Sequence, residues 1–487
     1  MDVSAIYDVE GAVGDAEVML WKELIMTLLQ FLRQARQVHL QYLSGALSES
    51  PVYVIGNPSA DLDSIVSAIV YSYCANNRLP RKSPRPHIPL LNLPNIPAGT
   101  ELYRLRPEFA VSLWSSTNFP ALADAEQFDN SLQSAGNILR EHVMTVADFA
   151  QSLEDLKVLK QIIAEATLVD WNAWSNPSRS DKTFGSLTGL SGASFRAVGC
   201  IDHHVDEKAM PSSEILPEGQ PMIIQPGPGS CASLITKQMQ EQNLWDAAPA
   251  ELAQVAKLAL SAILIDTSNL TAEGKVTDVD REAVEFLQSR IKAADGQNEW
   301  KLEEFYNTVL HAKKNCLDLL TLAEILDRDY KDWTETSQSS GKTVKLGFCS
   351  AVRPIRWIVQ KAGGPEKCLH AVRSFAASAE KDLDVLVIMT AFTGKDDKFC
   401  RELFINVMRD NEAAIKGVKR FADETSDHLG LVKWSPLDKE DIPNLNGDSL
   451  SQLNMEPPLW GQLWVQTNVA GSRKQVAPLL RAAVAKL

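Results

Sequence analysis

The chain has few cysteines, no excess of basic charge and no long apolar run. Its seven cysteines are odd in number and scattered without a Cys-x-x-Cys pair, which favours reduced thiols over a disulfide framework or a structural zinc site. No apolar run reaches the ~20 residues that would span a bilayer. The N-terminus lacks the basic and apolar regions of a secretory signal, and its acids disfavour a mitochondrial transit peptide. We therefore expect a cytoplasmic protein that makes no membrane contact.

The balance of charge is acidic. A formal net charge of −14 disfavours nucleic acid as a partner, because non-specific binding needs a basic surface that displaces counterions from phosphates. An acidic protein can still bind a polyanion where cations gather in one cleft or where metal ions supply positive charge. At 487 residues the chain exceeds what one hydrophobic core usually supports, so two domains are expected.

Apolar runs alternate with helical patterns in the first part of the chain. Residues 16–43 read as an amphipathic helix, and 52–55, 166–169 and 198–201 are short apolar runs suited to buried strands. A helical pattern at 146–164 lies between two of these runs. Strands that alternate with helices predict an α/β fold with a parallel sheet and helices on both faces. In such sheets, ligands bind beyond the carboxyl ends of the strands.

A second, smaller α/β unit is predicted towards the C-terminus. Its strands are expected at 344–349, 385–390 and 403–407. Helices are expected at 277–291 and 300–326, and the polar, glycine-containing stretch between them is the best candidate for an interdomain linker. The expected organisation is an N-terminal helical extension (1–48), a parallel-sheet domain (49–293), a linker (294–303) and a C-terminal α/β domain (304–487).

Acidic side chains follow the apolar runs. Asp61 and Asp63 lie two residues apart after the first run, and Asp170 follows the second. Carboxylate oxygens are the preferred ligands of hard divalent cations, so these positions are candidate metal ligands. Each of these acids could also have a purely structural role, because Asp-x-Asp is common in turns and either Asp63 or Ser64 could cap the next helix.

The triplet Asp202-His203-His204 is the stronger signal. Three consecutive polar residues directly after a buried strand cost folding free energy if they are buried without partners, so they are expected to bind a ligand or to face solvent. Imidazole suits Mn, Co or Zn ions, and a second histidine can donate to a phosphate oxygen. A fourth apolar segment also ends in an acid, Asp266. The four acidic blocks would repel one another unless cations bridge them, which indicates a centre with two divalent ions.

These four blocks, in this order, resemble the signature motifs of the DHH phosphoesterase superfamily. The resemblance implies that Asp170 bridges two metal ions and that His204 contacts a phosphate. It also implies that Asp202 supports the paired histidines rather than binding metal directly. The metal ligands that it implies are Asp61, Asp63, Asp170, His203 and Asp266.

The C-terminal part resembles the DHHA2 domain that accompanies this catalytic domain in family II pyrophosphatases and exopolyphosphatases. Its marks are Arg-Asp-Tyr-Lys at 328–331 and Ala-Gly-Ser-Arg-Lys-Gln-Val at 470–476. Arginine offers phosphate a planar fork, and lysine offers it a point charge. The same basic residues could also belong to the solvated start of a helix. The implied phosphate contacts are Lys331, Arg473 and Lys474. The block 226–233 resembles a Gly-Ser-Cys element, whose small residues could admit a phosphate or simply start a helix.

One position separates the subfamilies. Family II pyrophosphatases have a histidine where this chain has Asn57, a feature that it shares with the exopolyphosphatases of fungi. Since an amide oxygen is a poorer transition-metal ligand than imidazole, Mg²⁺ is favoured, with Mn²⁺ or Co²⁺ as alternatives.

The resemblance implies an exopolyphosphatase that removes the terminal phosphate of inorganic polyphosphate with a two-metal-activated hydroxide. No obligate protein partner is evident. The alternatives are a prune-like phosphohydrolase of short polyphosphates or nucleotides, an inorganic pyrophosphatase and, in another class, a non-catalytic protein that binds phosphate chains.

Overall fold

The computed structural model describes most of residues 26–486 and divides the chain into two compact units, the first ending at Cys316 and the second running from Leu317 to Leu487. The residues outside the description are 1–25, 78–84, 119–125, 175, 179–180, 182, 213–215, 218, 242–248, 295–299, 339–340, 438–444, 446, 457–458 and 487. Half of the predicted linker, residues 295–299, therefore lies outside the described residues. The predicted domain boundaries stay a prediction.

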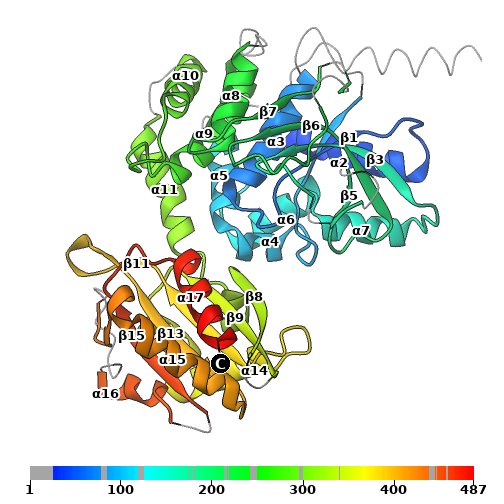
Figure 1. The fold of residues 1–487 in the computed structure, drawn as a ribbon. Coiled ribbons are helices and arrows are strands. Elements are labelled where there is room, and N and C mark those ends of the chain that lie inside the picture. Colours follow the sequence, from blue (N-terminus) through cyan, green and yellow to red (C-terminus); the bar gives the residue numbers. More distant parts are fainter. Residues whose placement is uncertain are drawn as a thin grey trace, which may run out of the picture. The chain divides into compact units, whose positions relative to one another are not determined.

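The first unit is built on a seven-stranded sheet in the order β2-β1-β3-β6-β5-β4, with β7 also paired to β6 (Figure 1). Strands β2, β1, β3, β6 and β7 run parallel, and the β4–β5 hairpin adds antiparallel pairs at one edge. The predicted parallel sheet is confirmed. The strands are β1 (Val52–Ile55), β2 (His87–Leu90), β3 (Ile162–Val169), β4 (Asn176–Pro177), β5 (Phe184–Ser186), β6 (Ala193–Asp202) and β7 (Met222–Ile224).

Ten helices of this unit lie among the described residues. Helix α11 packs against α5 and α9 and so belongs to the first unit. None of the described helices is long and apolar enough to cross a membrane. The helices are α2 (Leu28–Ser44), α3 (Leu62–Asn77), α4 (Thr100–Leu105), α5 (Pro107–Asn118), α6 (Leu132–His142), α7 (Val146–Asp155), α8 (Cys231–Glu241), α9 (Pro249–Asp266), α10 (Asp278–Ala294) and α11 (Leu302–Lys314).

Two predicted helices are too long. The one expected at 300–326 forms α11, which ends at Lys314, and α12 (Leu322–Asp327), with a turn between them. The pattern at 146–164 forms α7 only as far as Asp155, and β3 begins at Ile162. Lys157 adopts a positive φ of 50°, which a helix does not accommodate. Leu159 continues the apolar spacing but is 98% exposed, so the spacing that resembled one helix does not follow a single buried face.

The amphipathic helix predicted at 16–43 is described from Leu28 onwards as α2. Thr27 caps it, with the Thr27 side chain accepting from Gln30 N and the Gln30 side chain accepting from Thr27 N. This reciprocal pair satisfies amides that the first helical turn leaves without partners. Leu28, Phe31 and other apolar residues of α2 join the core of the first unit, so this helix is part of the domain.

The sheet of the second unit has the order β14-β15-β13-β10-β9-β8, and only the pair β9–β10 is parallel. The strands predicted at 344–349, 385–390 and 403–407 are confirmed as β9, β10 and β13. The strands are β8 (Tyr330–Thr336), β9 (Thr343–Ala351), β10 (Val385–Thr390), β13 (Glu402–Val407), β14 (Leu431–Lys433) and β15 (Gly461–Gln466), with β11 (Phe392–Thr393) and β12 (Phe399–Cys400) forming a separate pair.

Two apolar clusters lie on opposite faces of this second sheet. Along β10, Leu386 and Ile388 belong to one cluster, while Val385 and Val387 belong to the other. Because side chains alternate across a strand, this division places a helical layer on each face, and the predicted α/β class is confirmed. One layer contains α12 (Leu322–Asp327), α13 (Ile355–Ala362) and α14 (Pro365–Ala376). The other contains α15 (Glu412–Leu429) and α17 (Arg473–Ala485), which are labelled in Figure 1.

Candidate functional site

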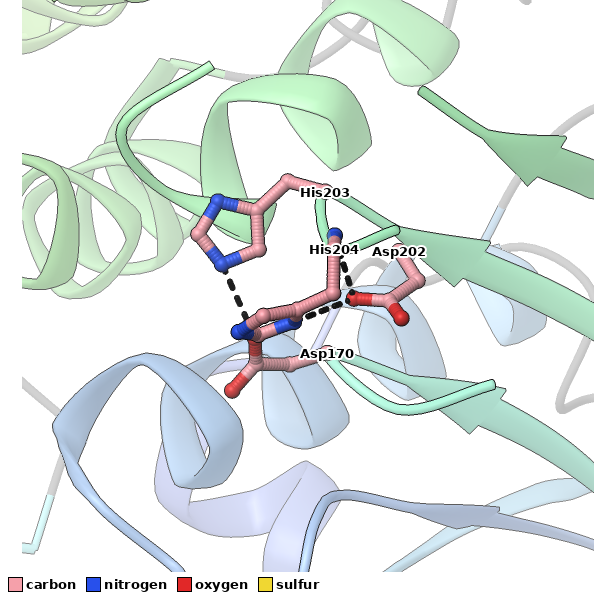
Figure 2. A group of neighbouring side chains, drawn as sticks. All are labelled: Asp170, Asp202, His203 and His204. Atoms are coloured by element: carbon pink, nitrogen blue, oxygen red, sulfur yellow. Dashed lines mark hydrogen bonds and ion pairs between the residues drawn. The ribbon is translucent and has the colours of Figure 1, made fainter. Parts of the chain in front are cut away.

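Two neighbouring parallel strands carry the first group of site residues. Asp170 directly follows β3, and β6 ends at Asp202 and continues into His203 and His204. Because Val169 of β3 pairs with Ile201 of β6, the residues that follow lie side by side. The candidate ligand atoms of all four polar side chains lie within 4.8 Å of one another (Figure 2). The structure therefore brings together the triplet and the acid of the second block.

His203 is held at one ring nitrogen and faces carboxylates with the other. Its Nδ1 lies 2.8 Å from the carbonyl oxygen of Pro228, and since a carbonyl only accepts hydrogen bonds, Nδ1 carries a proton. Its Nε2 lies 3.1 Å from Asp170 Oδ1 and 3.8 Å from Asp63 Oδ2. This is the arrangement of a metal-binding histidine whose second nitrogen is anchored by the backbone.

His204 and Asp202 form a separate pair. Asp202 Oδ1 accepts from the backbone amide of His204 at 3.2 Å and lies 2.8 Å from its Nδ1. The other oxygen, Oδ2, accepts from Asn172 Nδ2 at 2.5 Å. Asp202 is fully buried, whereas His204 is exposed. Asp202 thus uses both oxygens to orient its neighbours, and the His204 ring is accessible to a ligand.

Asp63 lies in the first turn of α3 and is bound by the start of α8. Its Oδ1 accepts from Ser230 Oγ at 2.8 Å and from the amide of Ala232 at 3.1 Å, and its Oδ2 accepts from the amide of Cys231 at 2.6 Å. The N-terminus of a helix favours such a negative charge. The Gly-Ser-Cys element at 226–233 therefore starts a helix, and its amides bind a carboxylate of the protein.

Asp170 is buried, and its two oxygens have different surroundings. Oδ2 accepts from Asn57 Nδ2 and from Ser64 Oγ, each at 2.8 Å. Among the described residues Oδ1 contacts only the two histidines, with His203 Nε2 at 3.1 Å and His204 Nδ1 at 3.5 Å. Since both Asp170 Oδ1 and a neutral His203 Nε2 present lone pairs, a proton or a cation must lie between them. The donor set of this cluster, carboxylates with one imidazole, fits a divalent metal ion.

The remaining two acids lie at the ends of helices. Asp61 is exposed, and its Oδ1 accepts from the amide of Ser64 at 3.1 Å, as expected for a helix cap. Asp266 ends α9, and its Oδ1 lies 3.7 Å from Lys313 Nζ on α11. Both acids are near enough to the centre to influence the charge of Asp63 or Asp170.

The clustered carboxylates disfavour one another's charged forms. Burial, followed by the charge of Asp63, raises the pKa of Asp266 to about 8, although Lys313 opposes this shift. Burial and the charge of Asp63 likewise raise the pKa of Asp170 to about 7. Burial would lower the pKa of His203, but its hydrogen bond to Asp170 and the charge of Asp63 raise it to about 10. The cluster thus holds protons that a metal ion would displace.

In the second unit the two blocks of the predicted phosphate site come together. Arg473 begins α17, and it donates from NH1 to the carbonyl oxygen of Asp329 at 2.8 Å and from NH2 to Asp329 Oδ1 at 2.7 Å. Lys331 is exposed on β8. The side chain of Lys474 lies outside the described residues. The roles of these three residues stay predictions.

Several contacts of the site had little or no signal in the sequence. Ser64 and Asn172 stand beside predicted ligands, but nothing local shows that they donate to Asp170 and Asp202. Lys313 had no signal, because it approaches Asp266 from a helix nearly fifty positions later. The carbonyl of Pro228 could not have been found from residue types, because any residue carries one.

Residues 307–483 match the family model described as "DHHA2 domain". The chain carries a DHHA2 domain. This match confirms the predicted resemblance of the C-terminal part. Over 466 residues the chain is 29% identical to a protein of Schizosaccharomyces pombe named "Putative exopolyphosphatase", with 93% of this chain and 97% of that protein covered. Among solved structures, the DHHA2-containing chain matches a "Methanococcus jannaschii putative family II inorganic pyrophosphatase" with a TM-score of 0.41 and 18% identity, covering 89% of this chain and 99% of that one.

Proposed function

We propose that this protein is an exopolyphosphatase, a hydrolase that removes the terminal phosphate from inorganic polyphosphate with the help of divalent metal ions. The observation that carries the proposal is the pair of the buried Asp170 Oδ1 and the partly buried His203 Nε2, 3.1 Å apart, with Asp63 alongside. The similarity to the S. pombe protein, which extends over nearly the whole of both chains, supports the same substrate class.

The proposed metal ligands are those that the sequence predicted, and two divalent ions are the proposed occupants. Such ions supply an activated water at neutral pH and neutralise charge on phosphate oxygens. Mg²⁺ is favoured over Mn²⁺ and Co²⁺, because His203 is the only imidazole in the proposed set and hard carboxylates make up the rest. The ligands are Asp61, Asp63, Asp170, His203 and Asp266.

The other residues of the site hold and neutralise the substrate. His204 is exposed, and its hydrogen bond to Asp202 raises its pKa, so a protonated ring donates to an oxygen of the terminal phosphate. Lys331, Arg473 and Lys474 of the second unit are the proposed contacts to the phosphate chain. A protonated His204 would offset part of the charge that develops on the leaving phosphate in the transition state.

Phosphate release from substrates of defined length tests the proposal. The purified full-length protein is given long-chain polyphosphate, tripolyphosphate, pyrophosphate or a cyclic nucleotide, each with Mg²⁺, Mn²⁺ or Co²⁺. We expect phosphate from both polyphosphates, and a loss of at least ~100-fold in the Asp170→Asn variant. Asp155→Asn is the matched control, because Asp155 is an exposed acid at the end of α7.

The outcomes separate the alternatives. Release from pyrophosphate alone would replace the proposal with a pyrophosphatase, and hydrolysis of the nucleotide alone would favour a prune-like enzyme. Metal binding without any hydrolysis would indicate a non-catalytic protein. Undiminished hydrolysis by Asp170→Asn would remove Asp170 from the metal-binding role.

A further inference from the structure

Asp280 lies outside the proposed ligand set, yet its carboxylate is fully buried and hydrogen-bonded on all sides. Thr277 donates to Oδ2 from its amide at 2.8 Å and from its hydroxyl at 2.9 Å, which is the pairing expected at the start of α10. Two further donors come from far away in the sequence. The amide of Gly229 lies 3.0 Å from Oδ1 and 2.9 Å from Oδ2, and Ser233 Oγ donates to Oδ1 at 2.7 Å.

The contact with Gly229 connects Asp280 to a short segment that touches two proposed metal ligands. We call residues 226–230 the anchor loop. One member, Pro228, accepts from His203 Nδ1 at 2.8 Å, and another, Ser230, donates to Asp63 Oδ1 at 2.8 Å. Gly229 lies between these two in the sequence. A shift of Gly229 would therefore move the partners of both His203 and Asp63.

Within the anchor loop, Gly229 is closely packed. A Cβ atom on Gly229 would lie 2.9 Å from the carbonyl oxygen of Lys275 and 2.7 Å from Thr267 Cγ2. Thr267 directly follows the proposed ligand Asp266. Gly229 is thus packed against the residue that follows α9 on one side and bound to Asp280 on the other, so that these contacts determine its position.

We propose that Asp280 is a positioning residue of the metal centre. By holding the amide of Gly229, it fixes the Pro228 carbonyl that keeps the proton on His203 Nδ1 and directs Nε2 towards Asp170. Through the same loop it places Ser230 against Asp63. Partners of this kind raise metal affinity because they orient the ligands before the ion binds. The inference rests on the proposed function of the site as a metal centre.

The binding of Mn²⁺, followed by the EPR signal of the free ion, tests the proposal with a readout other than activity. Asp280→Ala removes the acceptor for the anchor loop, and we expect about 10- to 100-fold weaker Mn²⁺ binding. Asp280→Asn should bind Mn²⁺ about two- to fivefold more weakly, because its amide oxygen still accepts from Gly229 and Thr277, whereas its NH2 replaces the second oxygen that accepts from Gly229. Since Asp280 touches neither substrate nor the proposed ligands, kcat at saturating Mn²⁺ should recover more than the affinity does.

Asp278→Asn is the matched control. Asp278 is an exposed acid in the same first turn of α10, so it shares the interaction with the helix N-terminus, but among the described residues it makes no hydrogen bond with the anchor loop. We expect its Mn²⁺ affinity to equal that of the wild type. An equal loss in Asp278→Asn and Asp280→Ala would overturn the proposal, because the effect would then come from the charge at the helix start.

Other outcomes also decide the matter. Thermal unfolding shows whether each variant is folded, and a folded Asp280→Ala that binds Mn²⁺ like the wild type would refute the role of Asp280. If Asp280→Ala does not fold, Asp280→Asn decides, and unchanged affinity in that variant would count against the proposal. Wild type that binds Mn²⁺ but hydrolyses no polyphosphate would sink the proposed function and leave this inference standing.

Discussion

The carboxamide of Asn57 donates to the carboxylate of Asp170, with Nδ2 2.8 Å from Oδ2. Its orientation is determined by a second contact, because Asn57 Oδ1 accepts from the amide of Ser59 at 2.8 Å. If the amide were turned over, its NH2 would face an N–H group and its oxygen would face a carboxylate, so both contacts would be repulsive. Asn57 is therefore a hydrogen-bond donor to Asp170 and does not offer its oxygen to the cluster. The expected preference for Mg²⁺ rests on the missing second imidazole at this position.

Removing either donor to Asp170 Oδ2 should weaken metal binding. Asn57→Ala and Ser64→Ala each delete one 2.8 Å hydrogen bond to the same oxygen, and we expect roughly tenfold weaker Mn²⁺ binding for each. The double variant should lose more than either single one. Ser59→Ala is the control, because the backbone amide that orients Asn57 remains. Wild-type affinity in the double variant would show that these donors do not orient Asp170.

Without a metal ion, the protein should lose stability as the pH rises. Asp170 and Asp266 have pKa values of about 7 and about 8 in the folded state, both raised from 3.8, and that of His203 is raised from 6.5 to about 10. For each group the folded state holds a proton that the unfolded state has already released, so stability falls between about pH 4 and about pH 10.

The measurement is the melting temperature in EDTA at about pH 6 and about pH 9, where we expect a decrease of at least ~2 °C. Asp266→Asn should make this decrease smaller, because it removes one of the titrating groups. Saturating Mn²⁺ should reverse the trend, since a metal ion binds the deprotonated ligands. A melting temperature in EDTA that rises over this range would contradict the electrostatic description of the cluster.

His39 should make the first unit sensitive to acid. It is fully buried on α2, with Nδ1 2.9 Å from Tyr53 Oη, and burial together with the charge of Arg36 lowers its pKa to about 3. The unfolded chain binds a proton at His39 below about pH 6.5 and the folded chain does not, so stability falls with falling pH between these values. Between pH 7 and pH 5 the loss is at most about 2 kcal/mol.

Urea unfolding of the wild type and His39→Gln at both pH values measures this effect. The difference between the two proteins cancels the contribution of the other titrating groups. We expect the variant to lose less stability than the wild type on going to pH 5. An equal loss in the two proteins would mean that His39 does not titrate on unfolding in this range.

Arg473 should matter for substrate affinity through its shape as well as its charge. Its guanidinium makes two hydrogen bonds to Asp329, and a lysine cannot reproduce that planar arrangement. We expect Arg473→Lys and Lys331→Ala each to raise the KM for polyphosphate roughly tenfold or more, with a smaller change in kcat. Arg409→Ala is the control, since Arg409 also pairs with an acid, Asp382. An unchanged KM in both variants would exclude these residues from the phosphate site.

The pattern of residues in the sequence was sufficient to predict the strands and the acids at their ends. Buried runs such as 52–55 and 385–390 have no polar interruption, so their apolar character predicts strands that form with those bounds. The helix at 146–164 was wrong beyond Asp155 because apolar spacing continued to Leu159, which tertiary packing leaves in solvent. Asp170 and the triplet meet because β3 and β6 pair in parallel, which places the residues that follow the two strands side by side. The tertiary structure, and not the local pattern, decides that these two strands are neighbours.

By itself, the sequence determined the α/β class, the DHHA2 domain and the set of residues from which a metal centre can be built, because these depend on residue type and local pattern. Only the tertiary structure decided how each group is held. The anchor loop reaches His203, Asp63 and Asp280 from positions 25, 167 and 51 residues away. Hydrogen bonds over such separations depend on which elements pack together. That is decided by the burial of whole faces and not by any local spacing.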